Sequence, residues 1–189
     1  MIRDEILQRY IAGESLTGLD GTGLDLSGCD LHGADFEGGV WDKADFTGAN
    51  LAGAKFHKCR LRHAKLAKAD LRGANLERCE IVEADLSGAD ASGAGFRNSF
   101  LNDANLDGAN LAGADLRFCK CTGVKMEGTV WTSARFDHMT RFDPGKVAQY
   151  AVMKYEGPPG GVFLKRGGVP PPPGSPTGTG TETTGGFSG

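Results

Sequence analysis

Bulky apolar residues return at every fifth position over most of the chain. The residue two positions before each of them is small, and it is nearly always Ala. A period of five fits neither an α-helix, at 3.6 residues per turn, nor a β-strand, at 2. Positions two apart face the same side of an extended segment, so each unit points one bulky and one small side chain inward. The inward bulky series begins Leu26, Leu31, Phe36, Trp41, Phe46, Leu51, Phe56, Leu61, Leu66, Leu71 and Leu76.

Glycine indicates where the chain turns between these units. The next small residue comes three positions after each bulky one. In a straight extended chain an odd spacing would point its side chain outward, so the chain must turn a corner to keep it inside. Gly often occupies the second position after the bulky residue, and Gly tolerates the backbone angles of tight corners. Repeated corners of one hand wind the chain into a solenoid with a narrow core. The corner glycines include Gly28, Gly33, Gly38, Gly48, Gly53, Gly73, Gly88, Gly93, Gly108, Gly113, Gly123 and Gly128.

These units resemble those of a known family. Ala44-Asp45-Phe46-Thr47-Gly48 is similar to the A(D/N)LxG-like consensus of pentapeptide-repeat proteins, as are residues 49–53, 69–73 and 104–108. The resemblance covers residues 24–138. It implies an all-β solenoid, a right-handed quadrilateral β-helix with four units, or twenty residues, in each coil. Residues 24–138 then form about six coils, a column roughly 27 Å tall at ~4.8 Å per coil.

Other elements are predicted at the two ends. Residues 1–23 form an N-terminal cap, in which Ile2, Ile6 and Leu7 lie at helical spacing and a degenerate first turn follows. The column needs such a cap because solenoid ends expose their core. Asp143-Pro144 favours the start of a second helix, which runs to about Tyr155.

This second helix belongs to a C-terminal cap over residues 139–166, with a short packed strand at 162–164. Residues 167–189 are rich in Pro, Gly and Thr and too poor in apolar residues to fold, which predicts a disordered tail. Some relatives dimerise through a C-terminal helix, so a homodimer through Asp143 to Tyr155 is an open alternative.

Charge and composition limit the kinds of partner. A net charge of −3 and a pI of 5.8 fit neither a nucleic-acid binder nor an extreme polyanion, so no direct nucleic-acid binding is expected. The N-terminus lacks the apolar core of a signal peptide, and no run reaches the ~18 apolar residues of a membrane helix. The five cysteines follow the repeat rather than a zinc pattern. We expect a bacterial cytoplasmic protein with no membrane contact.

No catalytic, metal or cofactor site is predicted. The sequence holds no Ser/His/Asp set and no phosphate loop, and its inward positions are small or apolar. His57 and His63 point outward whereas Cys59 points inward, so the three cannot converge on one ion. Cys59 shares a column of small residues with Cys79, Ser99 and Cys119, which we interpret as free buried thiols with one hydroxyl.

Two charge patterns leave alternatives open. Asp30, Asn50, Asp70, Asp90 and Asn110 form an acidic stripe, which serves either local turn chemistry or a partner. Residues 25–45 are predominantly acidic and residues 55–72 predominantly basic. That asymmetry along the column either prevents self-association or orients a partner.

One corner of the column departs from the glycine pattern. Segments 57–60, 77–80, 97–100 and 117–120 lie twenty residues apart and should stack; we call them the basic corner. Cations beside exposed aromatics suit a carboxylate-rich or phosphate-bearing surface. The alternative is a solvated face whose Phe residues touch a terminal segment. The predicted partner-binding residues are Lys58, Arg60, Arg78, Arg97, Phe100, Arg117, Phe118 and Lys120.

These patterns leave three candidate functions. The first is a non-catalytic protein-interaction scaffold, partner unknown, that binds through the basic corner. The second is implied by the resemblance, since some relatives modulate DNA gyrase or topoisomerase as DNA mimics and confer inhibitor or toxin resistance. The basic segment 55–72, the near-neutral charge and the uninterrupted repeat depart from that pattern. The third is a purely structural repeat protein.

Overall fold

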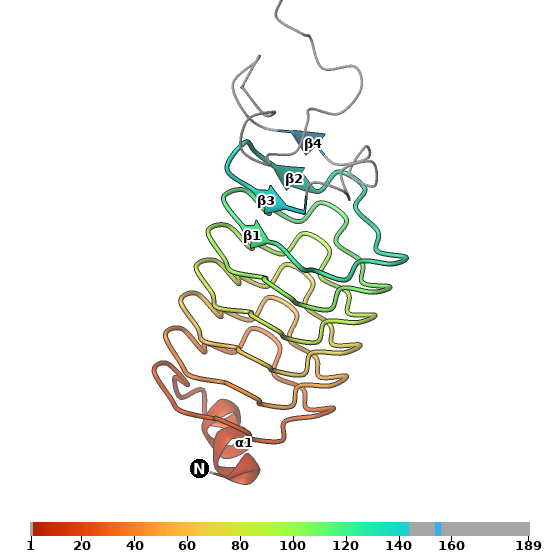
Figure 1. The fold of residues 1–189 in the computed structure, drawn as a ribbon. Coiled ribbons are helices and arrows are strands. Elements are labelled where there is room, and N and C mark those ends of the chain that lie inside the picture. Colours follow the sequence, from red (N-terminus) through yellow and green to blue (C-terminus); the bar gives the residue numbers. More distant parts are fainter. Residues whose placement is uncertain (1, 144–153, 156–189) are drawn as a thin grey trace, which may run out of the picture.

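A single column of stacked coils dominates the computed structural model of the chain, which describes residues 2–143 and 154–155 (Figure 1). Helix α1 (Arg3–Ile11) lies at the N-terminal end. The regular strands are short and gather toward the other end. They are β1 (Lys120–Cys121), β2 (Arg135–Phe136), β3 (Arg141–Phe142) and β4 (Lys154–Tyr155).

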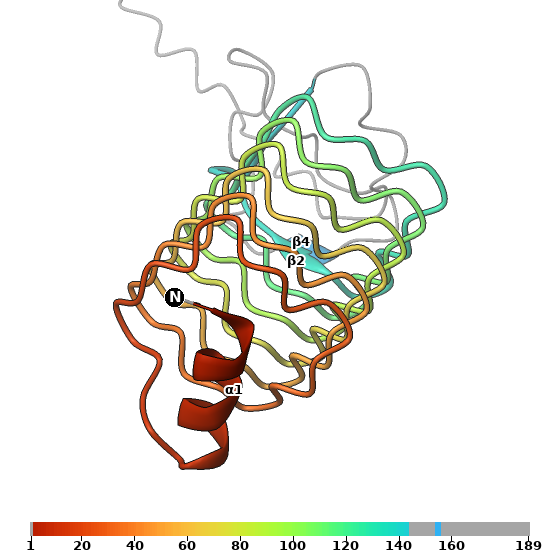
Figure 2. The same cartoon turned by 90° about the horizontal axis from the view of Figure 1, so that it is seen from below.

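Successive coils pair in parallel with a register of twenty residues, as in Asp25↔Asp45 and Asp45↔Lys65. The paired residue bonds to the coil before it. Asp45 N donates to Leu24 O at 2.8 Å, and Leu26 N donates to Asp45 O at 2.7 Å. Most sides contribute a single bridge because the rest of each five-residue unit is in a turn. Viewed along the column, the coils are roughly four-sided (Figure 2).

The predicted glycine corners are confirmed. In a representative turn, Ala54 N donates to Leu51 O at 3.0 Å, and Gly53 has a φ of 66°. A positive φ at the third residue is the pattern of a type II turn. No atom lies within 4 Å of where a Gly53 Cβ would stand, so backbone conformation rather than space favours glycine here.

The inward columns are buried as the period predicts. Phe36, Phe56 and Leu76 are 0% exposed and lie one above another. The rings of Phe36 and Phe56 stack at 4.7 Å between centroids, 12° from parallel. Aromatic side chains therefore fill the core in this part of the column.

At the N-terminal end, α1 lies across the first coils (Figure 2) and buries Ile6 completely. Interstrand bonding begins at Leu16, whose N–H donates to Asp35 O at 3.1 Å. Gly21 occupies the next inward position, and a Cβ there would stand 2.1 Å from the Trp41 ring. The first turn looks degenerate in sequence because the Trp41 ring of the second coil fills the space of its missing side chain.

Toward the C-terminus the register changes. Lys120 pairs with Arg141 and Cys121 with Phe142, a separation of twenty-one residues. The buried Asp137 carboxylate makes the longer turn, since it accepts the N–H groups of Met139 and Thr140 at 3.0 and 3.1 Å.

The predicted C-terminal helix requires a correction. Lys154 and Tyr155, which the prediction places at its end, form β4 and pair in parallel with β2. The edge of the last coil offers unpaired backbone groups, and strand pairing satisfies them. The rest of the predicted helix, the strand at 162–164 and the tail at 167–189 lie outside the described residues.

Candidate functional site

The structure brings the segments of the basic corner into one stack. Parallel bridges join Arg60 to Glu80, Glu80 to Phe100 and Phe100 to Lys120. Arg78 N donates to Arg97 O at 2.9 Å in the same stack. All eight predicted partner-binding residues therefore lie along a single corner of the column.

The backbone of the basic corner is strained. Lys58, Arg78, Asn98 and Phe118 have φ values of 61°, 58°, 60° and 64° at the position that many other turns give to glycine. A neighbouring corner shares this geometry at Lys43, His63, Glu83 and Asp103. Left-handed geometry costs a residue with a Cβ about 1–2 kcal/mol. The sequence prediction omits Asn98 because its side chain is neither cationic nor aromatic. The absence of glycine at position 98, where the repeat often has one, is the signal that could have included it.

The inner lining of the basic corner is a column of hydrogen-bond donors. Cys59 Sγ, Cys79 Sγ and Cys119 Sγ donate to the carbonyls of Phe36, Phe56 and Phe96 at 2.9, 2.7 and 2.7 Å. The five cysteines are free and buried. Burial raises the pKa of Cys59 to about 12, so its thiol stays protonated at neutral pH and is a poor nucleophile.

Ser99 takes the same place with a hydroxyl. Its Oγ donates to Leu76 O at 2.6 Å and accepts the N–H of Cys79 at 3.0 Å. The interior of the corner is therefore occupied by structural hydrogen bonds, and its chemistry toward a partner lies in the outward side chains.

Several of these outward cations already have carboxylate partners. Lys58 Nζ lies 3.7 Å from Glu37 Oε1, and Arg60 Nε lies 2.7 Å from Asp42 Oδ2.

Arg117 is held more tightly, since its guanidinium binds both carboxylate oxygens of Asp115, with the closer contact at 2.6 Å. Partial burial alone would raise the pKa of Asp115, but hydrogen bonds from Arg117 and the charges of Arg117 and Arg135 outweigh it and lower that pKa.

Three other cations of the basic corner are Arg78, Arg97 and Lys120. In the described part of the chain, none of the three has a carboxylate within ion-pair distance. Two of them lie against aromatic rings instead. Lys120 Nζ is 4.7 Å from the centroid of Phe100, and Arg97 Cζ is 5.7 Å from that of Phe118. The two Phe side chains are 37% and 39% exposed.

The acidic and basic segments of the column neutralise one another. Lys55 Nζ lies 3.7 Å from Asp35 Oδ2, and Lys65 Nζ lies 3.0 Å from Asp45 Oδ2. Together with the pairs at Lys58 and Arg60, these contacts join residues 55–72 to the coil beneath. The charge asymmetry read along the sequence is therefore largely cancelled by contacts between neighbouring coils.

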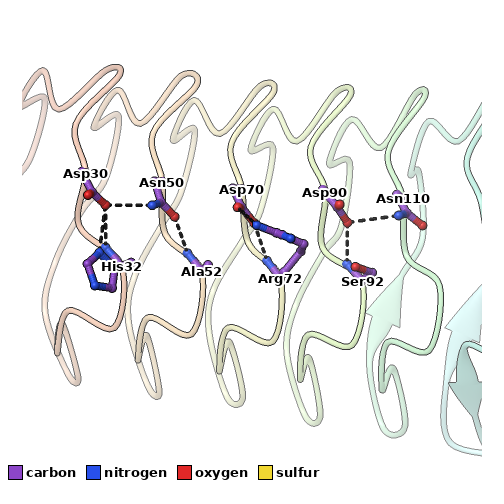
Figure 3. Close-up of polar contacts among 9 residues, drawn as sticks. All are labelled: Asp30, His32, Asn50, Ala52, Asp70, Arg72, Asp90, Ser92 and Asn110. Atoms are coloured by element: carbon purple, nitrogen blue, oxygen red, sulfur yellow. Dashed lines mark hydrogen bonds and ion pairs between the residues drawn. The ribbon is translucent and has the colours of Figure 1, made fainter.

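The acidic stripe takes part in turn chemistry (Figure 3). Asp70 Oδ1 and Asp90 Oδ1 accept the backbone N–H two residues ahead, both at 3.1 Å. Asn50 Nδ2 donates to Asp30 Oδ1 across coils at 2.8 Å. These bonds favour the local interpretation of the stripe over a partner-binding one.

Other kinds of site find no support in residues 2–143 and 154–155. They contain no group of three His, Cys, Asp or Glu side chains placed to hold a metal ion. His57 Nδ1 and His63 Nδ1 instead face Glu37 and Glu83, at 3.0 and 3.4 Å. None of the helices found there has the length and apolar character needed to cross a bilayer.

Comparison with known proteins agrees with the repeat. A family model described as pentapeptide repeats matches overlapping segments between residues 12 and 130. No curated protein matches the chain. A pentapeptide repeat protein from the Arabidopsis thaliana thylakoid lumen is 35% identical, over 53% of this chain and 66% of its own, with a TM-score of 0.42.

Two solved structures with TM-scores above 0.5 share the fold. The pentapeptide repeat protein Rfr23 from the cyanobacterium Cyanothece 51142 is 24% identical, over 74% of this chain and 99% of its own, with a TM-score of 0.55. Full-length QnrB1, a plasmid-mediated fluoroquinolone resistance protein, is 17% identical over 74% and 80%, with a TM-score of 0.53. These likenesses imply a right-handed β-helix solenoid.

Proposed function

The chain belongs to the pentapeptide repeat family, and from its surface we propose that it is a non-catalytic protein-interaction scaffold that binds its partner through the basic corner. One observation carries the proposal. Arg78, Arg97 and Lys120 lack carboxylate partners among the described residues and lie on the corner that also exposes Phe100 and Phe118. Arginine and aromatic side chains are enriched at protein interfaces.

Two lysines elsewhere on the column support this choice of surface by contrast. Lys55 and Lys65 face carboxylates of the coil beneath, which leaves little net charge for a partner.

A non-catalytic role is consistent with what the core contains. Its inward positions hold mainly apolar side chains, the Ser99 hydroxyl and thiols, and burial raises the pKa of Cys59 to about 12. Every outward carboxylate of the acidic stripe engages a turn N–H or a neighbouring side chain.

The DNA-mimic alternative has less physical support. A mimic of DNA would present unneutralised carboxylates along the column, whereas Asp35, Asp42 and Asp45 pair with cations one coil above. The likeness to QnrB1 concerns the fold. Dimerisation through Asp143 to Tyr155 concerns residues that lie mostly outside the described ones.

Affinity capture from a lysate of the source cells tests the proposal. We expect Arg97→Glu to lose a protein that the wild-type chain retains, because the reversed charge repels an acidic partner. Lys68→Glu is the control for charge reversal, since Lys68 is an exposed cation that lies away from the basic corner. Retention of the same proteins by the wild-type chain and Arg97→Glu would overturn the choice of surface.

A further inference from the structure

Resting on the proposed function, we infer that part of the basic corner binds a short acidic peptide segment that also carries an apolar side chain. The surface consists of Arg78, Arg97, Phe100, Phe118 and Lys120, which we call the Arg97 patch. Lys58, Arg60 and Arg117 fall outside it because carboxylates of this chain already occupy them.

Arg97 is the centre of the patch. Its Nε is buried and has no hydrogen-bond partner in the described part of the chain. Phe118, from the coil above, lies against the guanidinium, with Cζ 5.7 Å from the ring centroid. An arginine held in one place by an aromatic ring has less side-chain entropy to lose, and its planar fork matches a carboxylate in a bidentate contact.

Phe100 and Lys120 repeat this arrangement beside it. They are bridged residues on neighbouring coils, and the Lys120 ammonium lies over the Phe100 ring at 4.7 Å. The patch therefore offers two cations next to two partly exposed rings, with Arg78 one coil further along. An aromatic surface bordered by cations fits an apolar side chain flanked by carboxylates.

The size of the patch indicates a short segment. From Arg78 to Phe118 is two coil steps, or about 10 Å at ~4.8 Å each. An extended peptide covers that distance in about three residues at ~3.3 Å per residue. The first and third side chains of such a segment face the same way, so a carboxylate and an apolar side chain at those positions can contact Arg97 and the neighbouring ring together.

The charges around the patch favour a peptide over a nucleic acid. Glu77, Glu80 and Asp115 lie on or beside the same corner, and the whole chain has a net charge of −3. Nucleic-acid affinity depends on many phosphate contacts. A continuous phosphate backbone along this corner would come close to these carboxylates, which would repel it. The chain's own segment 156–189 contains Glu156 and Glu182 against Lys165 and Arg166, so it is no acidic ligand.

Fluorescence anisotropy of the full chain with a labelled peptide of repeating Glu-Glu-Phe-Phe tests the inference, because each face of the extended peptide then carries both kinds of side chain. We expect saturable binding that weakens as salt is added, because the contacts include exposed charges. Arg97→Ala and Phe118→Ala should each weaken it about tenfold, the effect of losing an interface anchor. Arg97→Lys should show an intermediate loss, since it keeps the charge without the fork. Lys68→Ala should change the affinity less than about twofold.

Peptide variants keep the test independent of how the protein variants fold. A Gln/Phe peptide and a Glu/Ser peptide should both bind at least about tenfold more weakly than Glu/Phe. Equal affinity for Glu/Phe and Gln/Phe would refute the inference. Tighter binding of oligothymidine through the same residues would replace the peptide by a nucleic acid.

Comparison with the capture experiment separates the two proposals. If no peptide binds while Arg97→Glu still loses a captured protein, the corner is functional and the acidic-peptide inference is wrong. If neither the peptides nor the captured proteins respond to Arg97 variants, both proposals are wrong. A partner that is captured through the patch but lacks an acidic segment also overturns the inference.

Discussion

Aspartate and asparagine recur one position before the inward bulky residues because their side chains close the turn that follows. Asp90 Oδ1 accepts the N–H of Ser92 at 3.1 Å, and Asn110 Oδ1 accepts that of Ala112 at 3.1 Å. Asn110 Nδ2 also donates to Asp90 Oδ1 at 3.1 Å. Either residue supplies the acceptor, but Asn adds a donor that reaches the preceding coil. The use of both Asp and Asn at this position of the repeat thus has a chemical basis.

The strain at the basic corner should be measurable by substitution. We expect Arg78→Gly to raise the free energy of unfolding by about 1 kcal/mol, because glycine removes the Cβ at a φ of 58°. Gly53→Ala is the converse, and should lower it by about 1 kcal/mol for the same reason. Urea denaturation of both variants checks this. A loss of stability in Arg78→Gly would mean that its side chain contributes more to the fold than its backbone strain costs.

Ser99 is the most sensitive member of the inner column. Ser99→Ala should lower the free energy of unfolding by about 1–3 kcal/mol, because it strands the buried N–H of Cys79, whose acceptor is Ser99 Oγ. Cys59→Ser, which keeps a donor to Phe36 O, should change stability by less than about 1 kcal/mol. Thermal unfolding of the two variants makes the comparison. Equal effects would show that the Ser99 hydroxyl has no special role.

At the scale of elements, the coil is the unit of packing, and neighbouring coils compensate for one another. Trp41 projects into the space that Gly21 leaves in the coil beneath. The sequence pattern alone gives no sign that positions 21 and 41 are coupled. In the structure they form one complementary pair, so the first coil depends on the second.

This complementarity predicts a rescue. Gly21→Leu should destabilise by about 1–3 kcal/mol through overpacking, and Trp41→Leu by about 3 kcal/mol through the cavity it leaves. The double variant should be more stable than the sum of the two losses implies, because the leucine introduced in the first coil fills the space of the lost ring. A double-mutant cycle from denaturation curves measures the coupling. Simple additivity would contradict the packing described for this coil.

The sequence predicted what is periodic and missed what depends on side-chain geometry. Burial of Phe56 and Leu76 and the pairing of Glu80 with Phe100 follow from counting by five and by twenty. Arg60 pairs with Asp42, eighteen residues away. This contact depends on side-chain conformation, and the periods of five and twenty do not predict it. Arg141 stacks on Lys120 only because one extra residue enters the turn at Asp137, and a fixed period hides it.

At the scale of the whole molecule, hydrogen bonds hold several carboxylates of the column in their ionised form. Hydrogen bonds from Ser27 and from Arg72 lower the pKa values of Asp25 and Asp70. A hydrogen bond from His57 lowers that of Glu37. Hydrogen bonds from Thr22 and His32 likewise lower the pKa values of Asp20 and Asp30, so protonation affects several coils of the column.

The direction of the pH dependence follows from these shifts. A carboxyl group whose pKa is lower in the folded state contributes stability above its unfolded pKa, about 3.9 for Asp, and loses that contribution as the pH falls through the folded pKa. We therefore expect the free energy of unfolding to decrease below about pH 4. Denaturation at neutral pH and at about pH 3 provides the measurement. An Asp70→Asn variant should lose less on acidification, and an equal loss would assign the effect elsewhere.

The register of twenty residues has a consequence for how this chain can change length. Removing one pentapeptide keeps the hydrophobic rhythm, but it turns every later residue by a quarter of a revolution about the column axis. Deletion of one pentapeptide between Ser99 and Arg117 would then place Phe118 on a different side of the column from Arg97. The inward positions would still hold apolar residues. Removing twenty residues restores the alignment. The core thus tolerates insertions and deletions of five residues. A binding surface that runs along the column is preserved only when whole coils of twenty residues are inserted or deleted.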